Sequence, residues 1–295
     1  MKQDPIFIVG TGRCGSTMFH DVLSHHGDLA WLSNIVAKRP GKPRANALLN
    51  RALDLPGAAP VLRKLFQPSE PYVFWERYCK GFSRPYRDLE ADDVIPGDIP
   101  KIRNAFDQAM PENKIPLAKI TGWPRVRYLK EIFPDAKFVH IVRDGRAVVN
   151  SVLNAPYFDG WSGPEQWARG HLDEQQKQAW IDCGESFIVL AAIGWENRMR
   201  AFQEVRAAMS DSDYLEFRYE DFCANPREMT ERTLSFLGLE NSSATGGFLA
   251  MTESFNIASK NDKWKQDLSR KQQRELNWYL APMLQDYGYN VENHH

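Results

Sequence analysis

The largest concentration of chemically useful side chains lies near the N-terminus, in the stretch GTGRCGST at residues 10–17. It follows the apolar run IFIV and precedes a helical pattern that opens at Ser16 or Thr17. A glycine-rich turn between a strand and a helix gathers unpaired backbone N–H groups and the positive end of a helix dipole. Such a turn binds phosphate-sized anions. We therefore interpret residues 10–17 as an anion-binding loop, with an ordinary tight turn as the plainer alternative.

A second candidate anion site lies near residue 143. Arg143 follows the apolar run FVHIV, and Ser151 lies two turns into the helical pattern after it. A guanidinium group binds two phosphate oxygens at once, although an arginine at a strand end is also a frequent salt-bridge partner. Together with the first loop, this pair predicts a ligand that carries two separated phosphate groups.

The first loop nearly matches the nucleoside-triphosphate motif G-x-x-x-x-G-K-[ST], and the mismatch is informative. Ser16 stands where that motif has lysine, and Arg13 is the only cation in the loop. At the second strand end Arg143 precedes Asp144, whereas a triphosphate with magnesium favours an acidic residue there. A P-loop kinase is therefore the second choice among enzymes.

The elements that must position these residues follow a regular order. Apolar runs predict strands at residues 6–9, 117–120, 138–142 and 213–219, with helical patterns between them. Strands that alternate with helices in this way form a parallel sheet with right-handed crossovers. Ligands of such sheets bind beyond the carboxyl ends of the strands, where Arg13 and Arg143 both fall. We expect one α/β domain over residues 1–295.

Residues 38–116 interrupt this order with eleven prolines and many charges. We expect a helical and looped insertion that forms a lid or an acceptor cleft. Its segment PYVFWERYCKGF, residues 71–82, places Glu76 among aromatic residues, where burial would raise the pKa of its carboxyl towards that of a useful base. A small satellite core is the plainer interpretation of the same segment.

Composition excludes several classes of partner. The chain has 295 residues, with 37 basic and 38 acidic side chains, so no overall field favours nucleic acid or anionic lipid. No apolar run approaches the roughly 18 residues of a membrane span, and the first residues lead directly into a strand. We therefore expect a cytoplasmic protein without a membrane span and without a nucleic-acid partner.

The cysteines and histidines show no metal-binding spacing. The four cysteines are scattered without C-x-x-C motifs and are expected to be free thiols in a reducing compartment. The cluster His20, His25 and His26 fits no known ligand pattern, so we expect no metal. Cys14, at the predicted helix N-terminus, is expected to have a lowered pKa and to react readily with alkylating agents.

Three segments carry a family resemblance: GTGRCGST, HIVRDGRAVVNSV at residues 140–152, and FRYEDFCANP at residues 217–226 with its trailing FLGL. Together they resemble the sulfotransferases that use 3′-phosphoadenosine 5′-phosphosulfate. The resemblance runs from about residue 5 to about residue 288 and is weakest over residues 38–112. It implies a three-layer α/β fold with a central parallel sheet, of the type found in P-loop nucleoside triphosphate hydrolases, with mostly helical insertions.

The resemblance also implies roles for individual residues. The residues that would wrap the 5′-phosphosulfate are Gly12, Arg13, Cys14, Gly15, Ser16 and Thr17, with Arg13 also acting on the transferred group. Arg143 and Ser151 would hold the 3′-phosphate, and Tyr219 would touch the adenine. Lys260 lies roughly where the family's basic C-terminal loop closes over the nucleotide, although the usual Arg-Lys-Gly is absent.

The usual proton acceptors of the family are not at the matching positions. Lys119-Ile120-Thr121 stands where cytosolic members have Lys-Thr-His, and Asn34 stands where tyrosyl-protein members have a glutamate. By elimination we expect Glu76 to be the catalytic base, followed by Glu70 and then His20.

The predicted reaction is in-line transfer of a sulfuryl group from the nucleotide to an acceptor hydroxyl or amine, leaving 3′,5′-adenosine bisphosphate. No metal is required, because arginines and backbone dipoles neutralise the leaving phosphate. The acceptor is expected to be partly apolar or carrier-bound. A P-loop kinase and a non-catalytic sensor of the adenosine bisphosphate remain as alternatives.

Overall fold

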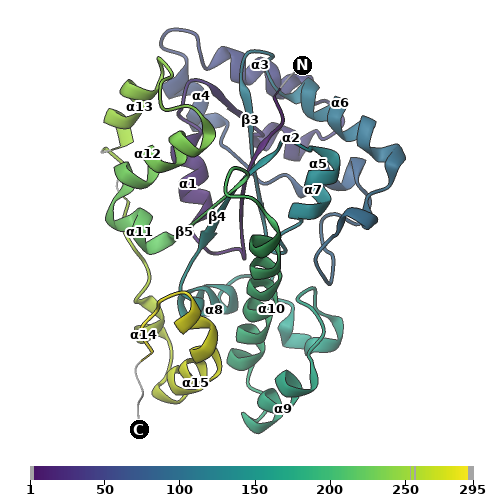
Figure 1. The fold of residues 1–295 in the computed structure, drawn as a ribbon, viewed down its shortest axis with the longest axis vertical. Helices are drawn as coiled ribbons and strands as arrows, with labels where there is room; N and C mark the ends of the chain where they lie inside the picture. Colours follow the sequence, from purple (N-terminus) through teal and green to yellow (C-terminus); the bar gives the residue numbers. More distant parts are fainter. Residues whose placement is uncertain (1–2, 253, 256, 292–295) are drawn as a thin grey trace.

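The computed structural model describes residues 3–252, 254–255 and 257–291, and in this part of the chain five parallel strands form one sheet (Figure 1). The strand order is β2-β3-β1-β4-β5. The strands are β1 (Ile6–Gly10), β2 (Leu29–Trp31), β3 (Ile115–Thr121), β4 (Lys137–Val142) and β5 (Tyr214–Arg218). The α/β class with a central parallel sheet is therefore confirmed. Strand β2 was not predicted, because three residues are too short to show a period.

The central strand β1 is buried along its whole length, as expected for a parallel sheet covered on both faces. Its odd and even residues contact different layers of helices. Phe7 and Val9 lie in one apolar cluster with side chains of α5 (Tyr72–Tyr78), α6 (Ile99–Ala109), α7 (Val126–Ile132) and α10 (Phe187–Ala208). Ile6 and Ile8 lie in a second cluster with side chains of α1 (Ser16–Leu23), α11 (Tyr219–Ala224), α12 (Pro226–Leu237) and α13 (Thr245–Thr252). These layers confirm the three-layer architecture.

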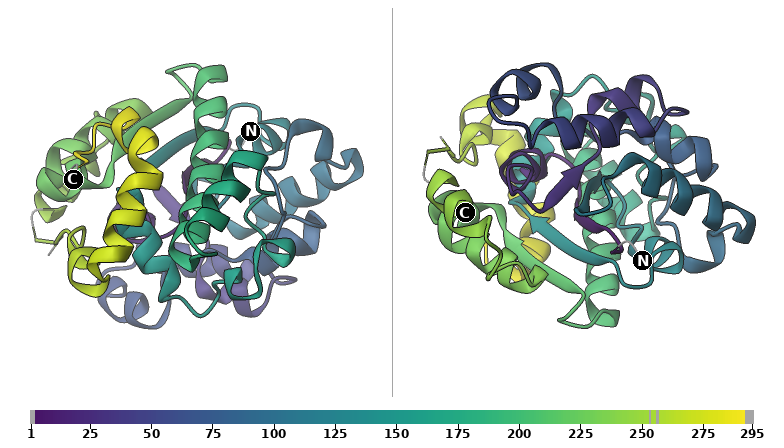
Figure 2. Two further views of the ribbon diagram at one scale, coloured as in Figure 1. Left: turned by 90° about the horizontal axis from the view of Figure 1, so that it is seen from below. Right: turned by 90° about the horizontal axis from the view of Figure 1, so that it is seen from above.

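The two helical layers are distinct in the views of Figure 2, where the green and yellow C-terminal segments and the blue segments flank the strands. At one end of the sheet, α8 (Gly145–Leu153) packs with α10 and α15 (Arg270–Asp286) around a third apolar cluster. The remaining α-helices of the described residues are α2 (Asn34–Lys38), α3 (Arg44–Ala52), α4 (Ala59–Leu65), α9 (Glu174–Asp182) and α14 (Lys263–Asp267). Among the described residues, no helix combines the length and apolar character needed to cross a bilayer.

The segment between residues 38 and 116 contains the helices α3, α4, α5 and α6, joined by loops. Buried amides anchor it to the sheet, since Asn46 donates hydrogen bonds from Nδ2 to the carbonyls of Trp31 and Ala109, both at 2.9 Å. The chain then returns to β3, which pairs directly with β1 so that Gly10 lies opposite Thr121. This pairing brings the end of β3 beside the glycine-rich loop.

Candidate active site

The loop after β1 has the backbone geometry of a close-fitting cradle. Gly12, Arg13 and Gly15 all adopt left-handed conformations, with φ angles of 82°, 57° and 91°. A Cβ atom on Gly15 would lie 2.2 Å from the ring of Tyr219, so glycine is required there. Helix α1 begins at Ser16, and Gly15 at its N-cap offers no side-chain cap to the first-turn N–H groups. The positive end of the helix dipole therefore faces the loop without a side-chain cap, where it can stabilise an anion.

The loop and the end of β4 come together as the sequence predicted. Arg13 donates a hydrogen bond from Nε to Ser151 Oγ at 2.7 Å, and Arg143 donates from Nη1 to the Arg13 carbonyl at 2.8 Å. They line a cavity of about 810 Å³, here called the donor cavity after the ligand that is proposed for it below. Of the predicted binding residues, it is lined by Arg13, Gly15, Thr17, Arg143, Ser151, Tyr219 and Lys260.

Arg143 is held in place on three sides. It donates from Nε to Asn261 Oδ1 and from Nη2 to the Lys260 carbonyl, each at 3.0 Å. Its guanidinium carbon lies 4.5 Å from the ring centre of Tyr219, within cation–π range. The loop of Lys260 therefore reaches the donor cavity through its backbone as well as its side chain.

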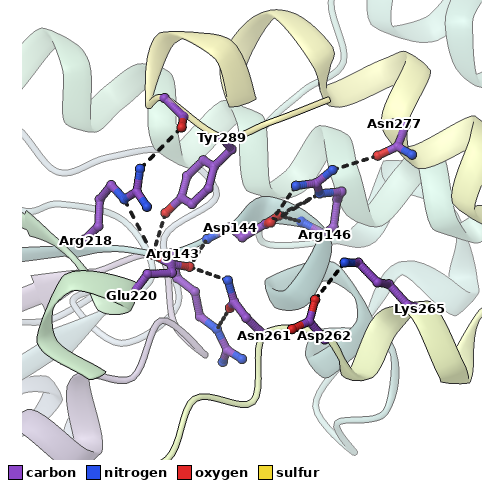
Figure 3. Close-up of polar contacts among 11 residues, drawn as sticks. Arg143, Asp144, Arg146, Arg218, Glu220, Asn261, Asp262, Lys265, Asn277 and Tyr289 are labelled. Atoms are coloured by element: carbon purple, nitrogen blue, oxygen red, sulfur yellow. Dashed lines mark hydrogen bonds and ion pairs between the residues drawn. The ribbon is translucent and has the colours of Figure 1, made fainter. Parts of the chain in front are cut away.

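The carboxylate of Glu220 connects this loop to the rest of the fold (Figure 3). It accepts hydrogen bonds from Asn261 Nδ2, from the backbone N–H of Asp144 at 3.2 Å and from the Tyr289 hydroxyl at 2.9 Å. Three segments far apart in the sequence thus meet at one carboxylate. Asn261 links Glu220 to Arg143, because it donates a hydrogen bond to the Glu220 carboxylate and accepts one from Arg143. Glu220 lies in the motif that carried the resemblance, but no role was predicted for it.

A second cavity, here called the acceptor cavity after the role that is proposed for it below, is also lined by residues of the loop and has a volume of about 610 Å³. It shares Arg13 and Thr17 with the donor cavity. Gly12 and Ser16 of the predicted loop line this cavity. Its other charged or hydroxyl-bearing lining residues include Glu70, Tyr72, Lys119, Thr121, Arg125, Asp159, Arg169 and Arg198.

Glu70 and Lys119 form a connected pair beside the loop. The Glu70 carboxylate accepts hydrogen bonds at Oε1 from the Tyr72 hydroxyl at 2.7 Å and from Thr121 Oγ1 at 2.8 Å. Its Oε2 lies 3.2 Å from Lys119 Nζ, and Lys119 donates to Thr17 Oγ1 at 2.8 Å. A carboxylate, a lysine and the loop hydroxyl are therefore linked in a row.

Lys119 was missed as a site residue. Sequence reasoning noted only that the histidine two positions later is absent. Lys119 is nevertheless a lysine in the buried strand β3, with its side chain about 9% exposed. A buried cation is rare without a partner or a role. A lysine within a predicted buried strand could therefore have been recognised from the sequence as a candidate site residue.

Glu76, the first-ranked base, lies outside both cavities. Its carboxylate accepts from the backbone N–H groups of Gly81 and Ser83, at 2.8 and 2.9 Å, and from Ser83 Oγ at 2.8 Å. Burial alone would raise its pKa, but these donors outweigh burial and lower the pKa below its ordinary value. The expected rise in the pKa of Glu76 is therefore wrong, because its side chain stabilises a turn.

Two further expectations about the loop region are corrected. Cys14, within the loop, is fully buried, and burial raises the pKa of its thiol by more than the Ser16 N–H lowers it, so the expected lowered pKa is wrong. His20, the third candidate base, is buried in α1, where burial and the nearby Lys119 cation lower its pKa to about 3. All four cysteines are free thiols, as predicted.

Comparison with known proteins identifies the family. A model described as the sulfotransferase family matches residues 5–243. The curated relatives include omega-hydroxy-beta-dihydromenaquinone-9 sulfotransferase Stf3 of Mycobacterium bovis and of Mycobacterium tuberculosis, each 25% identical over 285 residues. These alignments cover 81% of this chain and 64% of the relative, so the chain spans less than two thirds of the relatives' length.

Solved structures share the fold. Sulfotransferase STF9 from Mycobacterium avium aligns with a TM-score of 0.61 at 13% identity, covering 99% of this chain and 79% of that one. The sulfotransferase domain of the Synechococcus PCC 7002 olefin synthase aligns with a TM-score of 0.50 at 16% identity, covering 99% and 98%. The family model spans most of the sequence, including the loop, Arg143 and the Tyr219 segment. The chain belongs to the sulfotransferase family.

Proposed function

We propose that this protein transfers a sulfuryl group from 3′-phosphoadenosine 5′-phosphosulfate to a hydroxyl group of an acceptor. The observation that carries the proposal is that two cavities meet at the glycine-rich loop. Arg13 and Thr17 line both cavities, so a group held at the loop faces each of them. This arrangement suits a transfer reaction in which donor and acceptor occupy separate cavities that meet at the loop.

The residues of the donor cavity fit a nucleotide with two separated phosphate groups. The loop N–H groups and Arg13 would hold the 5′-phosphosulfate, and Arg143 with Ser151 would hold the 3′-phosphate. The part of the chain that the structure describes pairs neither Arg13 nor Arg143 with a carboxylate, so both charges remain available to an anion. Tyr219 and Met18 supply a partly apolar wall for the adenine.

Glu70 replaces Glu76 as the proposed base. Hydrogen bonds to Oε1 fix the orientation of its carboxylate, and Oε2 lies beside Lys119 at the loop. Glu70 would take the proton of the acceptor hydroxyl as that oxygen attacks sulfur, a role worth about 10²–10⁴-fold in rate. Lys119, Arg13 and the loop N–H groups would stabilise the charge that develops on the departing phosphate oxygen.

A hydroxyl acceptor is favoured over an amine. The curated relatives are named for an omega-hydroxy compound. An alkylamine is protonated at neutral pH, so it must lose one proton before attack and another during transfer, whereas an alcohol or phenol loses one, which a single carboxylate such as Glu70 can accept. The proposal therefore commits to an alcohol or phenol.

The test is transfer from ³⁵S-labelled donor to a panel of alcohols and phenols, with nucleotide affinity measured in parallel. We expect labelled product with the wild type and loss of product with Glu70→Gln at unchanged nucleotide affinity. Tight nucleotide binding with no transfer to any acceptor would instead identify a non-catalytic sensor. Phosphate transfer from ATP with magnesium would identify a kinase.

A further inference from the structure

The acceptor cavity has a wall of arginines that the proposed transfer does not use. Arg125, Arg169 and Arg198, here called the arginine wall, line the acceptor cavity and not the donor cavity. They come from the segment after β3, from the segment before α9 and from α10. Three separate parts of the chain therefore deliver cations to one side of one cavity.

The carboxylates of the cavity neutralise only part of this wall. Glu70 pairs with Lys119 at 3.2 Å, and Asp159 is shared between Arg169 at 3.0 Å and Arg84 at 3.3 Å. Among the described residues, no ion pair reaches the guanidinium of Arg125 or Arg198. The cavity therefore holds more positive charge than its own carboxylates balance.

The positive charge of Arg198 is the least compensated of the three. It donates from Nη2 to the Ala168 carbonyl at 3.2 Å, whereas its buried Nε has no hydrogen-bond partner among the described residues. Burial, together with the nearby charges of Arg169 and Arg125, lowers the pKa of Arg198 to about 9. A half-buried cation whose Nε is buried without a partner is costly to maintain unless an anion meets it.

Apart from the Asp159 carboxylate at Arg169, neutral groups hold the guanidinium groups of the wall in place. Arg198 lies over the ring of Trp123 at 5.9 Å, Arg169 over Phe158 at 5.1 Å and Arg125 over Phe82 at 5.0 Å. Aromatic faces and backbone carbonyls orient guanidinium groups without cancelling their charge. Such contacts prepare the wall to receive an anion.

A glycine in α10 also makes room for the wall. A Cβ atom on Gly194 would lie 2.8 Å from Arg169 Cδ, so this helix position accommodates the arginine only because it lacks a side chain. The arginine therefore lies against the helix backbone rather than reaching into solvent, and its side chain is about 5% exposed.

We propose that the acceptor carries, besides its hydroxyl, an anionic group, either a carboxylate or a phosphate, that binds at the arginine wall. This inference rests on the proposed function, because it assigns the same cavity to the acceptor. The hydroxyl would face Glu70 at the loop while the anion lies against Arg198 and its neighbours. A charged anchor of this kind would orient the acceptor and select against neutral alcohols.

The test uses three probes of one shape: 4-hydroxyphenylacetate, 4-hydroxybenzylphosphonate and the neutral methyl 4-hydroxyphenylacetate. Their affinities are measured by calorimetry with 3′,5′-adenosine bisphosphate at saturation, so that the donor cavity's phosphate sites are filled. We expect at least one anionic probe to bind about tenfold or more tightly than the ester. The better anion identifies carboxylate or phosphate as the preferred group.

Variants of α10 provide the matched comparison. Arg198→Gln should reduce the preference for the anion to about twofold or less while leaving the affinity for the ester and the bisphosphate unchanged. Arg200→Gln removes an exposed arginine two residues away, which pairs with Glu196 and Asp173, and should keep the full preference. If Arg198→Gln does not fold, Arg169→Gln removes a second cation of the wall and should also lower the preference.

Equal affinity for all three probes, absence of binding by all three, or a preference that persists in a folded Arg198→Gln protein would overturn the inference. Failure of the bisphosphate to bind in the first titration would instead contradict the donor assignment. The two failures are therefore distinguishable in one set of experiments.

Discussion

The donor and acceptor cavities share a loop but are constructed in different ways. The donor cavity takes the groups that we propose bind the anion from segments that directly follow β1 and β4, so backbone geometry supplies much of this proposed site. The acceptor cavity takes Glu70 from the insertion, Lys119 from the middle of β3 and Arg198 from α10. A site built from strand ends can be recognised in the sequence as contiguous motifs. A site built from side chains far apart in the chain appears in the sequence only as isolated residues.

The largest expected effect separates the two glutamates of the insertion. Glu70→Gln should lower kcat by about 10²–10⁴-fold, because it removes the proposed base while leaving the donor cavity intact. Glu76→Gln is the matched control and should stay close to wild-type activity, since its carboxylate stabilises the turn at Gly81 and Ser83. Turnover of labelled donor measures both variants. Equal losses in the two variants would contradict the assignment of the base to the acceptor cavity.

On the donor side, Arg143→Ala should remove most of the selectivity for the 3′-phosphate. We expect affinity for 3′,5′-adenosine bisphosphate to fall by about 10–100-fold, because charge-assisted hydrogen bonds are lost. Affinity for adenosine 5′-phosphate, which lacks the 3′-phosphate, should change little. Calorimetry with both nucleotides provides the measurement and its control. A wild type that binds the two nucleotides equally would refute the two-phosphate site.

Much of the donor cavity could be predicted from the sequence. The glycine-rich loop, Arg143 and Ser151 lie together as expected, because parallel strands end at one edge of the sheet. The acceptor cavity could not be predicted in the same way. Glu70 was ranked below Glu76 because aromatic neighbours in sequence suggested burial, whereas Glu76 faces the N–H groups of a turn.

The arginine wall illustrates the same limit. Arg125 follows a proline at the end of a strand segment, Arg169 lies in a loop and Arg198 lies in a long helix. The neighbours of each arginine in the sequence form no motif that would indicate an anion site. Only the packing of α10 against the loops before α9 and after β3 brings them together, and that packing depends on contacts between residues far apart in the chain.

A smaller effect on nucleotide affinity is expected from Glu220, which contacts the donor cavity only through Asn261 and Arg143. Glu220→Gln should weaken binding of the bisphosphate by a few-fold, because Asn261 would lose a charged partner and hold Arg143 less firmly. Glu231→Gln, in an exposed pair with Arg227 on α12, is the control and should have no effect on binding. If Glu220→Gln binds the bisphosphate as tightly as the wild type, the hydrogen bonds through Asn261 do not contribute to nucleotide binding.

The smallest expected effect concerns the alkylation rate of Cys14, the buried thiol of the loop. Because burial raises the pKa of Cys14, less of it is thiolate at neutral pH, and alkylation should be slow with or without nucleotide. Cys183, which is half-buried near the surface, should react first. Mass spectrometry of peptides after brief alkylation compares the two sites. Rapid labelling of Cys14 that nucleotide blocks would show that the thiol faces the donor cavity.

The central claim is that the donor and acceptor cavities meet at the loop, with Glu70 facing the transferred group. A crystal structure with bound 3′,5′-adenosine bisphosphate tests this most directly. We predict the 3′-phosphate at Arg143 and Ser151, the 5′-phosphate in the loop of residues 12–17, and Glu70 as the carboxylate nearest to the open side of the 5′-phosphate. A nucleotide bound outside the loop, or another carboxylate nearer to the 5′-phosphate, would contradict the account.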